Sequence, residues 1–349
     1  MERAVCFASP RVVTLEDSPP LAAGPGQVRL RTLYSGISAG TELTAYLGSN
    51  PYLTRSWDTG RRLFVEGAAT FPYPVTGWGY EEVGVVTGDS AEAGLHAGDV
   101  VWGIWGHRSD GLLPAAQAAR QVLPPGTDPV AGVFARPGAI ALNALLDADA
   151  HPGETVAVFG QGVIGLLATR LLALSGVRVI AVDTQPARLA ISESSGAWQT
   201  VTAGPDAGVA EQVKQLTHNH GADVCIELSG SYAALHEAIR AVCYGGRVVA
   251  AGFYQGSGSD LRLGEEFHHN RVEIVASQIS GPPFRHRSRW TRERLHEEFM
   301  RLVTEGQVDP RPLVSHVLPA AAVAGAFTAI TDPAAGALQV VLDFRSEQS

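Results

Sequence analysis

A glycine-rich turn near the middle of the chain has the residue types and spacing that bind phosphate. It reads Gly160, Gln161, Gly162, Val163, Ile164, Gly165. In such a turn Gly160 permits the tight bend, Gly162 lets the backbone approach a pyrophosphate, and Gly165 lets a helix pack closely on the preceding strand. The free amides and positive dipole end of that helix favour an anion. The turn therefore predicts a dinucleotide site.

The flanking residues supply the strand, helix and strand that such a site needs. Residues 155–159 are mostly β-branched and aromatic, as in a buried parallel strand, and a second apolar run ends at Asp183. Asp183 is expected to accept hydrogen bonds from a ribose diol and to repel a 2′-phosphate, which favours NAD over NADP. The nearby Arg188 leaves NADP open. A doubly wound domain whose turn glycines are only structural is the alternative.

Composition restricts the class of protein. With 349 residues, two domains are expected, and a net charge of −9 argues against a nucleic-acid binder. Lys214 is the only lysine, which excludes the tyrosine–lysine pair of short-chain dehydrogenases. The cysteines, Cys6, Cys225 and Cys243, lack metal or redox spacing and are expected to be buried free thiols. With no leader or membrane segment in the pattern, we expect a cytoplasmic protein without membrane contact.

The first 125 residues contain short apolar runs separated by glycine and proline. The runs lie at residues 4–8, 12–15, 27–34, 82–87 and 99–105. This spacing predicts a small, partly closed β-barrel. Residues 50–70 show no period and are expected to form a long loop, of the kind that often carries function.

Four segments make the chain resemble the medium-chain dehydrogenase/reductases. They are the nucleotide turn, SGISAGTE at 35–42, GYEEVGVV at 79–86 and GDVV at 98–101. The resemblance covers nearly the whole chain and implies an α/β fold: a GroES-like catalytic domain at 1–125, a Rossmann domain at 126–279, and a return to the catalytic domain at 280–349. It also implies that Ser229 contacts the cofactor. The strand at 272–278 often pairs across a dimer in relatives, so a homodimer is expected.

Zinc-dependent members of that family have ligands that this sequence lacks. The cysteine position holds Ser38 or Ala39, the histidine position holds Tyr80, and residues 134–143 offer no third ligand. Glu81 alone remains, whereas catalytic zinc needs three protein ligands. The four cysteines of the structural zinc lobe are also missing, so we expect a metal-free enzyme. A separate zinc site at Glu266, His268 and His269 is the alternative.

Without zinc, a side chain must handle the hydroxyl proton in hydride transfer. Tyr80 occupies the position of a lost zinc ligand and is expected to orient or protonate the substrate oxygen; simple packing is its alternative. Thr41 matches the family position that links the substrate oxygen to a proton relay, and Glu42 and Ser38 are its polar neighbours. Glu81 is a further catalytic candidate. His107 is a candidate base or an exposed loop histidine.

Two further groups of residues are candidates for substrate contacts. Apolar walls are expected from Trp78, Trp102 and Trp105. On the far side of the substrate, an arginine could hold a carboxylate or phosphate. The candidates there are His268, His269, Arg285 and Arg289. A solvated, arginine-rich connector is the alternative.

The favoured function is an NAD-dependent, zinc-independent oxidoreductase that interconverts a secondary alcohol and a ketone. The SGISAGTE segment also resembles bacteriochlorophyllide dehydrogenases and bacterial sugar or cyclitol dehydrogenases, which implies a polar, fairly large small-molecule substrate, as in secondary metabolism. A zinc-free quinone or enoyl reductase is the second hypothesis, and Asp183 argues against the NADPH that such enzymes prefer. The third is an NAD-binding protein without catalysis, such as a lens-type structural protein or a redox-sensing regulator.

Overall fold

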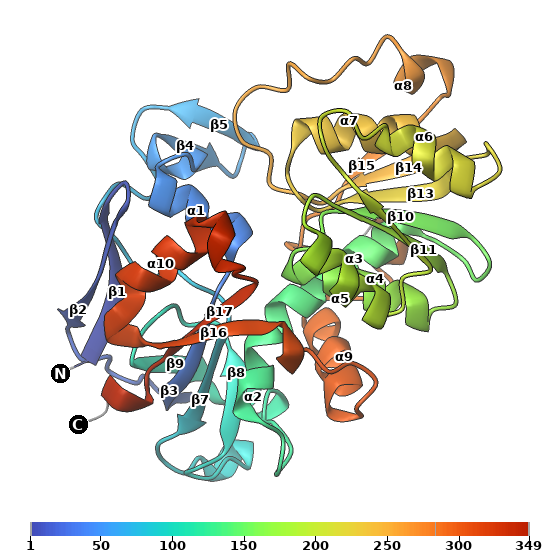
Figure 1. The fold of residues 1–349 in the computed structure, drawn as a ribbon. Coiled ribbons are helices and arrows are strands. Elements are labelled where there is room, and N and C mark those ends of the chain that lie inside the picture. The colour runs from blue at the N-terminus through green and yellow to red at the C-terminus, as the bar shows by residue number, and fades with distance from the viewer. Residues whose placement is uncertain (1, 283, 348–349) are drawn as a thin grey trace. The chain divides into compact units, whose positions relative to one another are not determined.

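The computed structural model describes residues 2–282 and 284–347, which form two compact units (Figure 1). Unit 1 combines residues 1–136 with residues 300–349, the blue start and red end of the chain, and unit 2 consists of residues 137–299. The chain passes between them within helices α3 (Ala135–Ala148) and α9 (Arg292–Thr304). These crossings lie later in the sequence than the predicted boundaries after residues 125 and 279.

Unit 2 is built on one parallel sheet. Its strands are β10 (Thr155–Phe159), β11 (Arg178–Asp183), β12 (Gln199–Thr202), β13 (Ala222–Glu227), β14 (Val242–Ala250) and β15 (Glu273–Ala276). They lie in the order β12-β11-β10-β13-β14-β15, with every pair parallel. This is the doubly wound order, in which ligands bind where the strand order reverses. The prediction of an α/β Rossmann fold is confirmed.

The helices of unit 2 bury both faces of that sheet. They are α3, α4 (Val163–Leu174), α5 (Pro186–Ser194), α6 (Val209–Leu216), α7 (Tyr232–Ala241), the short α8 (Glu266–His269) and most of α9, with a 3-10 turn η4 (Phe284–His286). In β10, Ala157 and Phe159 face a core that includes Leu235, whereas Val156 and Val158 face another that includes Ala144. Burial on both faces explains the unbroken apolar sequence of this strand.

Unit 1 contains the β-rich part of the chain. Its strands are β1 (Glu2–Ser9), β2 (Val12–Ser18), β3 (Gln27–Ile37), β4 (Arg55–Asp58), β5 (Leu63–Glu66), β6 (Val75–Thr76), β7 (Glu82–Val86), β8 (Val100–Gly103), β9 (Asp110–Pro114), β16 (Val314–Pro319) and β17 (Gln339–Asp343). One sheet has the order β2-β1-β6; a second has the order β16-β17-β3-β7-β8, with β9 also on β3. Strand β17, from the end of the chain, therefore lies beside β3, from its start.

Short helices connect these strands. They are α1 (Ala39–Leu47), α2 (Ala115–Arg120) and α10 (Val323–Thr331), with 3-10 turns η1 (Pro51–Leu53), η2 (Ala91–Ala93), η3 (Pro129–Phe134), η5 (Arg311–Leu313), η6 (Ala320–Ala322), η7 (Pro333–Ala335) and η8 (Arg345–Glu347). The stretch Pro129–Ala148 is apolar and long enough to span a membrane, but 67% of its tested window is buried in the protein. That burial is the pattern of a core helix.

The prediction of a structureless loop at residues 50–70 is wrong. Strands β4 and β5 form an antiparallel hairpin there, with Trp57 paired to Phe64. The carboxylate of Asp58 accepts hydrogen bonds from the amides of Gly60 and Arg61, which closes the turn. Rings of Tyr52 and Trp57 each lie 5.1 Å from that of Phe64. Aromatic pairing, rather than an alternating apolar pattern, stabilises this element.

Candidate functional site

Each of the three turn positions explains the presence of glycine in a different way. Gly160 has a φ of +86°, and a Cβ there would lie 2.8 Å from the amide of Ser229. A Cβ on Gly165 would lie 1.9 Å from the carbonyl oxygen of Gly160, so only glycine lets the helix approach the strand. A Cβ on Gly162 would meet nothing within 4 Å. The fold needs the first and last glycines, and space is open above the middle one.

That open space lies at the N-terminus of α4. Gly162 is the N-cap and supplies no side-chain cap, so the amides of the first turn, including those of Val163 and Ile164, lack helical partners. Such amides bind an anion. The buried Gln161 holds the turn, because its side chain donates to the carbonyl of Val158 at 2.9 Å and accepts from the hydroxyl of Thr169 at 3.0 Å.

Asp183 lies at the end of β11, beside this turn, and is 8% exposed. One carboxylate oxygen accepts the amide hydrogen of Gln161 at 2.6 Å, and the other accepts that of Gln185 at 2.8 Å. Each oxygen can still accept a further hydrogen bond, as a ribose diol requires. Arg188 is the third residue of α5, the helix that follows.

Ser229 also belongs to the predicted nucleotide site. Strands β10 and β13 are neighbours where the strand order reverses, and the loops after them carry Gly160 and Ser229. The amide of Ser229 donates to the buried carboxylate of Glu227 at 2.7 Å, and the hydroxyl of Tyr254 donates to the same group. Burial raises the pKa of Glu227, partly offset by these hydrogen bonds. These residues of unit 2 fit a dinucleotide.

In unit 1, three hydroxyl groups meet where the family's zinc ligands would be. Ser38 is the N-cap of α1, Thr41 lies in its first turn, and Tyr80 precedes β7. The hydroxyl of Tyr80 donates to Thr41 Oγ1 at 3.1 Å and is in hydrogen-bond contact with Ser38 Oγ. Because Tyr80 has one proton, Ser38 must donate to it. We call Ser38, Thr41 and Tyr80 the hydroxyl cluster; Thr41 and Tyr80 are partly exposed.

The phenol of Tyr80 is held in its neutral form. Burial, with the nearby charge of Glu81, raises its pKa well above the usual value, despite hydrogen bonds from its neighbours that act in the opposite direction. The guanidinium of Arg136 lies 5.9 Å from the ring centroid. A neutral phenol donates a hydrogen bond and can give up its proton to a developing negative charge.

Glu81, a predicted catalytic residue, is hydrogen-bonded to Gln339 rather than to Ser38, Thr41 or Tyr80. It is 2% exposed, and its carboxylate accepts from the Gln339 side chain at 3.0 Å. A Cβ on Gly36 would lie 2.4 Å from this carboxylate, which explains why glycine occupies that position in β3. Burial and the charges of Glu42 and Glu82 raise the pKa of Glu81 well above its usual value.

His107 is completely buried, so its interpretation as an exposed loop histidine is wrong. Its Nε2 lies 2.6 Å from the carboxylate of Glu42, and its Nδ1 lies 2.6 Å from the hydroxyl of Ser35. Both ring nitrogens of His107 therefore have hydrogen-bond partners within the protein. A base that takes a proton directly from substrate needs a free nitrogen, so this geometry does not fit that predicted role.

The three tryptophans that were predicted to line the substrate site lie in different environments. Trp78 is partly exposed, and its ring lies 5.7 Å from that of Phe71. Trp105 instead packs in unit 1, where a Cβ on Gly111 would lie 2.4 Å from its ring, and its Nε1 donates to Thr32 Oγ1 at 2.9 Å. Trp102 is buried. Of the three, Trp78 is closest in sequence to the hydroxyl cluster.

His268 and Arg285 lie in unit 2 in separate settings. His268 is exposed on α8, beside the ring of His269 at 5.5 Å. Arg285 forms an ion pair with Asp149, which engages the charge that was expected to hold a substrate anion. No hydrogen bond or ion pair of the described residues joins His268 to Arg285.

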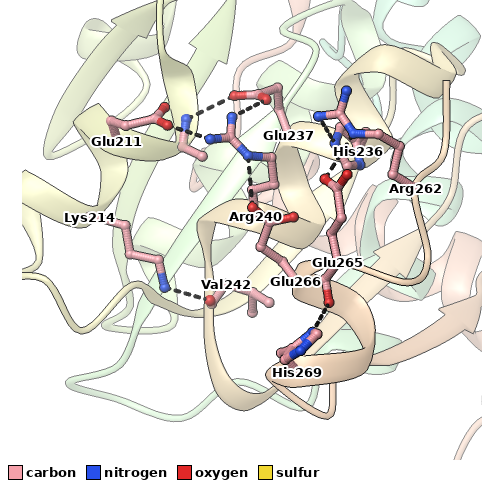
Figure 2. A network of polar contacts seen from close by, with 11 residues as sticks. Glu211, Lys214, His236, Glu237, Arg240, Val242, Arg262, Glu265, Glu266 and His269 are labelled. Carbon is pink, nitrogen blue, oxygen red and sulfur yellow. Dashed lines mark hydrogen bonds and ion pairs between the residues drawn. The ribbon is translucent and has the colours of Figure 1, made fainter.

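Metal-ligating side chains gather at two places in the described part of unit 2. The groups are His220, Asp223, Cys243 and His236, Glu265, Glu266; the predicted set with His268 and His269 is not among them. Figure 2 shows the surroundings of the second group, where Arg240 pairs with Glu266 and Arg262 donates to the ring of His236. These guanidinium groups supply the positive charge that a cation would bring.

The residues of unit 1 do not fit catalytic zinc. Ser38 and Tyr80 offer two neutral hydroxyl groups bonded to each other, and Glu81 is engaged by Gln339. Zinc in proteins takes cysteine, histidine or carboxylate ligands, three of them at a catalytic site. Within residues 2–282 and 284–347, no metal-ligating triad lies in unit 1.

Comparison with known proteins shows which proteins this chain resembles. Residues 163–295 match the model of the zinc-binding dehydrogenases. The chain is also 29% identical over 327 residues to D-guloside 3-dehydrogenase of Escherichia coli (strain K12), which covers 91% of this chain and 92% of that protein. Both matches are likenesses to the zinc-type alcohol dehydrogenase-like proteins. These relatives are dehydrogenases, which agrees with the expectation of an oxidoreductase, whereas the absence of catalytic zinc stays a prediction.

Solved structures agree with the fold of this chain. A zinc-binding dehydrogenase from Sinorhizobium meliloti 1021, bound to NADP, is 23% identical with a TM-score of 0.76, covering 98% of this chain and 99% of that one. An alcohol dehydrogenase from E. coli CFT073, complexed with NADH, is 18% identical with a TM-score of 0.75, with the same two shares.

Several residues of the site escaped sequence analysis. Glu82 is fully buried beside His107, and Gln339 comes from the far end of the chain to bind Glu81. Glu42 is named in the sequence only as a neighbour of Thr41, and its burial beside His107 is not foreseen. The signal for Glu82 was present, because this acidic residue follows Glu81 and begins β7, an otherwise apolar strand that is largely buried. The role of Gln339 depends on the pairing of β17 with β3, which no local pattern reveals.

Proposed function

We propose that this protein is an NAD(H)-dependent, zinc-independent dehydrogenase that interconverts a secondary alcohol and a ketone on a sugar or polyol-like substrate. The observation that carries the proposal is the hydroxyl cluster. It brings a neutral phenol and two aliphatic hydroxyls together at the positions where zinc ligands are expected, with no metal-ligating triad among the described residues of unit 1.

The hydroxyl cluster can supply the proton that ketone reduction needs. When bound, the nicotinamide supplies the hydride in reduction and accepts it in oxidation. As negative charge develops on the carbonyl oxygen, Tyr80 gives its proton to that oxygen, and the hydroxyl of Ser38, which already donates to Tyr80, restores it. Ser38 then regains a proton from solvent. Alcohol oxidation runs the same transfers in reverse.

The choice of NAD rests on Asp183. Its carboxylate lies at the end of β11, held by two backbone amides, with lone pairs left for a ribose diol. A 2′-phosphate at that position would meet a negative charge. The pyrophosphate would bind at the N-terminus of α4, and Ser229 would border the same site.

The substrate class is supported by the relative that acts on D-guloside, a sugar derivative, over nearly the full chain. Sugars and polyols carry the secondary alcohols that the hydroxyl cluster suits. We also propose a homodimer, because β15 is an edge strand of the described sheet, and a cytoplasmic location, which the three buried free cysteines suit. Light scattering and cell fractionation would test these two points.

The decisive experiment combines cofactor, substrate and metal. The purified protein is given NAD or NADP with a panel of glycosides, sugars and polyols, and nicotinamide absorbance is followed while zinc is measured by elemental analysis. We expect reduction of NAD by at least one glycoside or polyol in protein that contains no stoichiometric zinc. Stoichiometric zinc whose removal abolishes activity would contradict the proposal.

The same assay separates the alternative functions. NADPH oxidation with a quinone or enoyl substrate, and none with alcohols, would identify a reductase. NAD that raises the melting temperature without any turnover would identify a binding protein without catalysis.

Asp183→Asn tests the cofactor choice, because the amide oxygen keeps a hydrogen-bond acceptor while the charge is lost. We expect the preference for NAD over NADP to fall about tenfold or more.

A further inference from the structure

His107 is connected to both chain segments that carry the hydroxyl cluster, the start of α1 and the residues before β7. Its Nε2 lies 2.6 Å from one oxygen of the Glu42 carboxylate, and the other oxygen of Glu42 accepts the amide hydrogen of Ser38 at 2.9 Å. The backbone amide of His107 donates to the carbonyl of Trp78 at 3.0 Å. One histidine is thus connected to α1 and to the segment before β7.

The imidazole ring also fits against the residue that precedes Tyr80. Gly79 has a φ of +128°, and a Cβ there would lie 2.9 Å from three atoms of the His107 ring. No other residue type allows the ring and the backbone to approach so closely. The position of Tyr80 therefore depends on this ring, as does that of Ser38 through Glu42.

The hydrogen bonds of Ser35 indicate which atoms carry protons. The Ser35 hydroxyl has one hydrogen and donates it to Glu82 at 3.0 Å. The Nδ1 atom of His107, 2.6 Å from the same oxygen, must then donate to it, while Nε2 donates to Glu42. Both ring nitrogens carry hydrogen in this arrangement, so the ring is an imidazolium between two carboxylates.

Electrostatics agrees with that protonation state. Burial alone would lower the pKa of His107, but the carboxylates of Glu42 and Glu82 outweigh it and raise this pKa above the usual 6.5. The charged or titratable groups around the ring are Glu42 from α1, Glu82 from β7 and, beyond Glu42, the phenol of Tyr80. The hydrogen bonds and the electrostatics thus both favour a buried positive charge next to the hydroxyl cluster.

We propose that His107 is a positioning residue: as a buried imidazolium it holds Glu42 and the Gly79 backbone so that the hydroxyls of Ser38, Thr41 and Tyr80 stay in register. This inference rests on the proposed function for its kinetic consequence. His107 transfers no proton to substrate itself. The contribution of its positive charge is complete below about pH 6.5 and is lost as the pH rises through its raised pKa.

The first test needs neither substrate nor substitution. Nitrogen NMR of histidine-labelled protein reports whether both nitrogens of a ring are protonated, and His107→Gln identifies the resonance. We expect His107 to be doubly protonated at neutral pH, with its pKa raised above the usual value by the carboxylates of Glu42 and Glu82. A neutral His107 ring at pH 7 would overturn the proposal, whatever the enzyme's substrate.

The second test measures positioning. In His107→Gln the amide can still donate to Glu42 without charge, and Glu42→Gln alters the same contact while His107 is kept. We expect the NMR resonance of the Tyr80 phenol to shift in both variants, and turnover of NAD with the best alcohol to fall by up to about 10²-fold, with little change in the KM for NAD. The alkaline decline of wild-type kcat should disappear in His107→Gln.

His96→Gln is the matched control, because His96 is exposed. It should change neither the Tyr80 resonance nor the pH profile. If folded His107→Gln and Glu42→Gln leave both unchanged, the positioning role is wrong. If no alcohol is oxidised by wild type but the Tyr80 resonance responds to His107→Gln, the structural role stands and the proposed function fails. Circular dichroism of each variant confirms folding.

Discussion

The phenol of Tyr80 has the properties of an acid, because its raised pKa keeps it protonated at neutral pH. Tyr80→Phe removes only the hydroxyl and leaves the ring beside Arg136. We expect kcat for ketone reduction to fall about 10²-fold or more, the contribution of a positioned acid. The KM for the cofactor should stay nearly constant, since the nucleotide turn belongs to unit 2. Steady-state kinetics with a saturating ketone would measure both values.

Tyr73→Phe is the control for this substitution. Tyr73 is partly buried in the same unit, and its hydroxyl donates to the carbonyl of Ala45, outside the hydroxyl cluster. Loss of that hydroxyl should leave kcat unchanged. Equal rates in wild type and Tyr80→Phe would remove Tyr80 from proton transfer.

Glu81 makes a separate prediction about stability. Its folded pKa is raised by burial, so the folded state binds this proton more tightly than the unfolded state does. Stability from this group is therefore greatest below pH 4.5 and falls as the pH rises through the raised pKa. Glu81→Gln keeps a partner for Gln339 without a charge. We expect a higher melting temperature at pH 8, by about 2–4 °C per kcal/mol gained.

The pH dependence distinguishes this explanation from a general packing effect. The advantage of Glu81→Gln should shrink as the pH is lowered toward 4.5, where the wild-type carboxyl is neutral. A constant difference in melting temperature across the pH range would mean that Glu81 does not titrate in this way.

At the N-terminus of α4, substitutions of two different glycines affect ligand binding and folding stability separately. A Cβ on Gly162 enters open space, whereas one on Gly165 would lie 1.9 Å from a backbone oxygen. Gly162→Ala should fold with a melting temperature close to wild type but bind NAD at least about tenfold more weakly, because the methyl occupies the pyrophosphate position. Gly165→Ala should lose stability by several kcal/mol, through overpacking.

Calorimetry and thermal unfolding of the two variants measure these effects separately. Wild-type NAD affinity in Gly162→Ala would show that the pyrophosphate does not bind at this helix end. Wild-type stability in Gly165→Ala would mean that α4 can move away from β10 at little cost.

The sequence could predict elements whose determinants are local. The nucleotide turn is such a case, since strand, turn and helix lie within 30 residues and each glycine has a local reason. The β4–β5 hairpin was missed because its stability comes from rings of Tyr52, Trp57 and Phe64 rather than from a periodic pattern. Burial of His107 was missed because its partner Glu42 is 65 residues away in sequence.

At the scale of the whole molecule, the two units have separate cores, so a ligand of unit 2 should protect mainly unit 2. NADH at a hundred times its dissociation constant adds about 2.7 kcal/mol to the stability of the folded state it binds. We expect hydrogen exchange to slow around residues 160–165 and at the ends of β11 and β13. Protection that is strongest in the β4–β5 hairpin instead would place the nucleotide elsewhere.

The pairing of β17 with β3 has a consequence for biosynthesis. About 300 residues separate the two strands, and all of unit 2 is translated between them. At ordinary ribosome speeds β3 waits roughly 15–60 s for this partner. The middle of the chain can therefore complete its core before the beginning can, and an unpaired β3 edge is exposed to other nascent chains meanwhile. We therefore expect aggregation through this edge during translation, before β17 has been made.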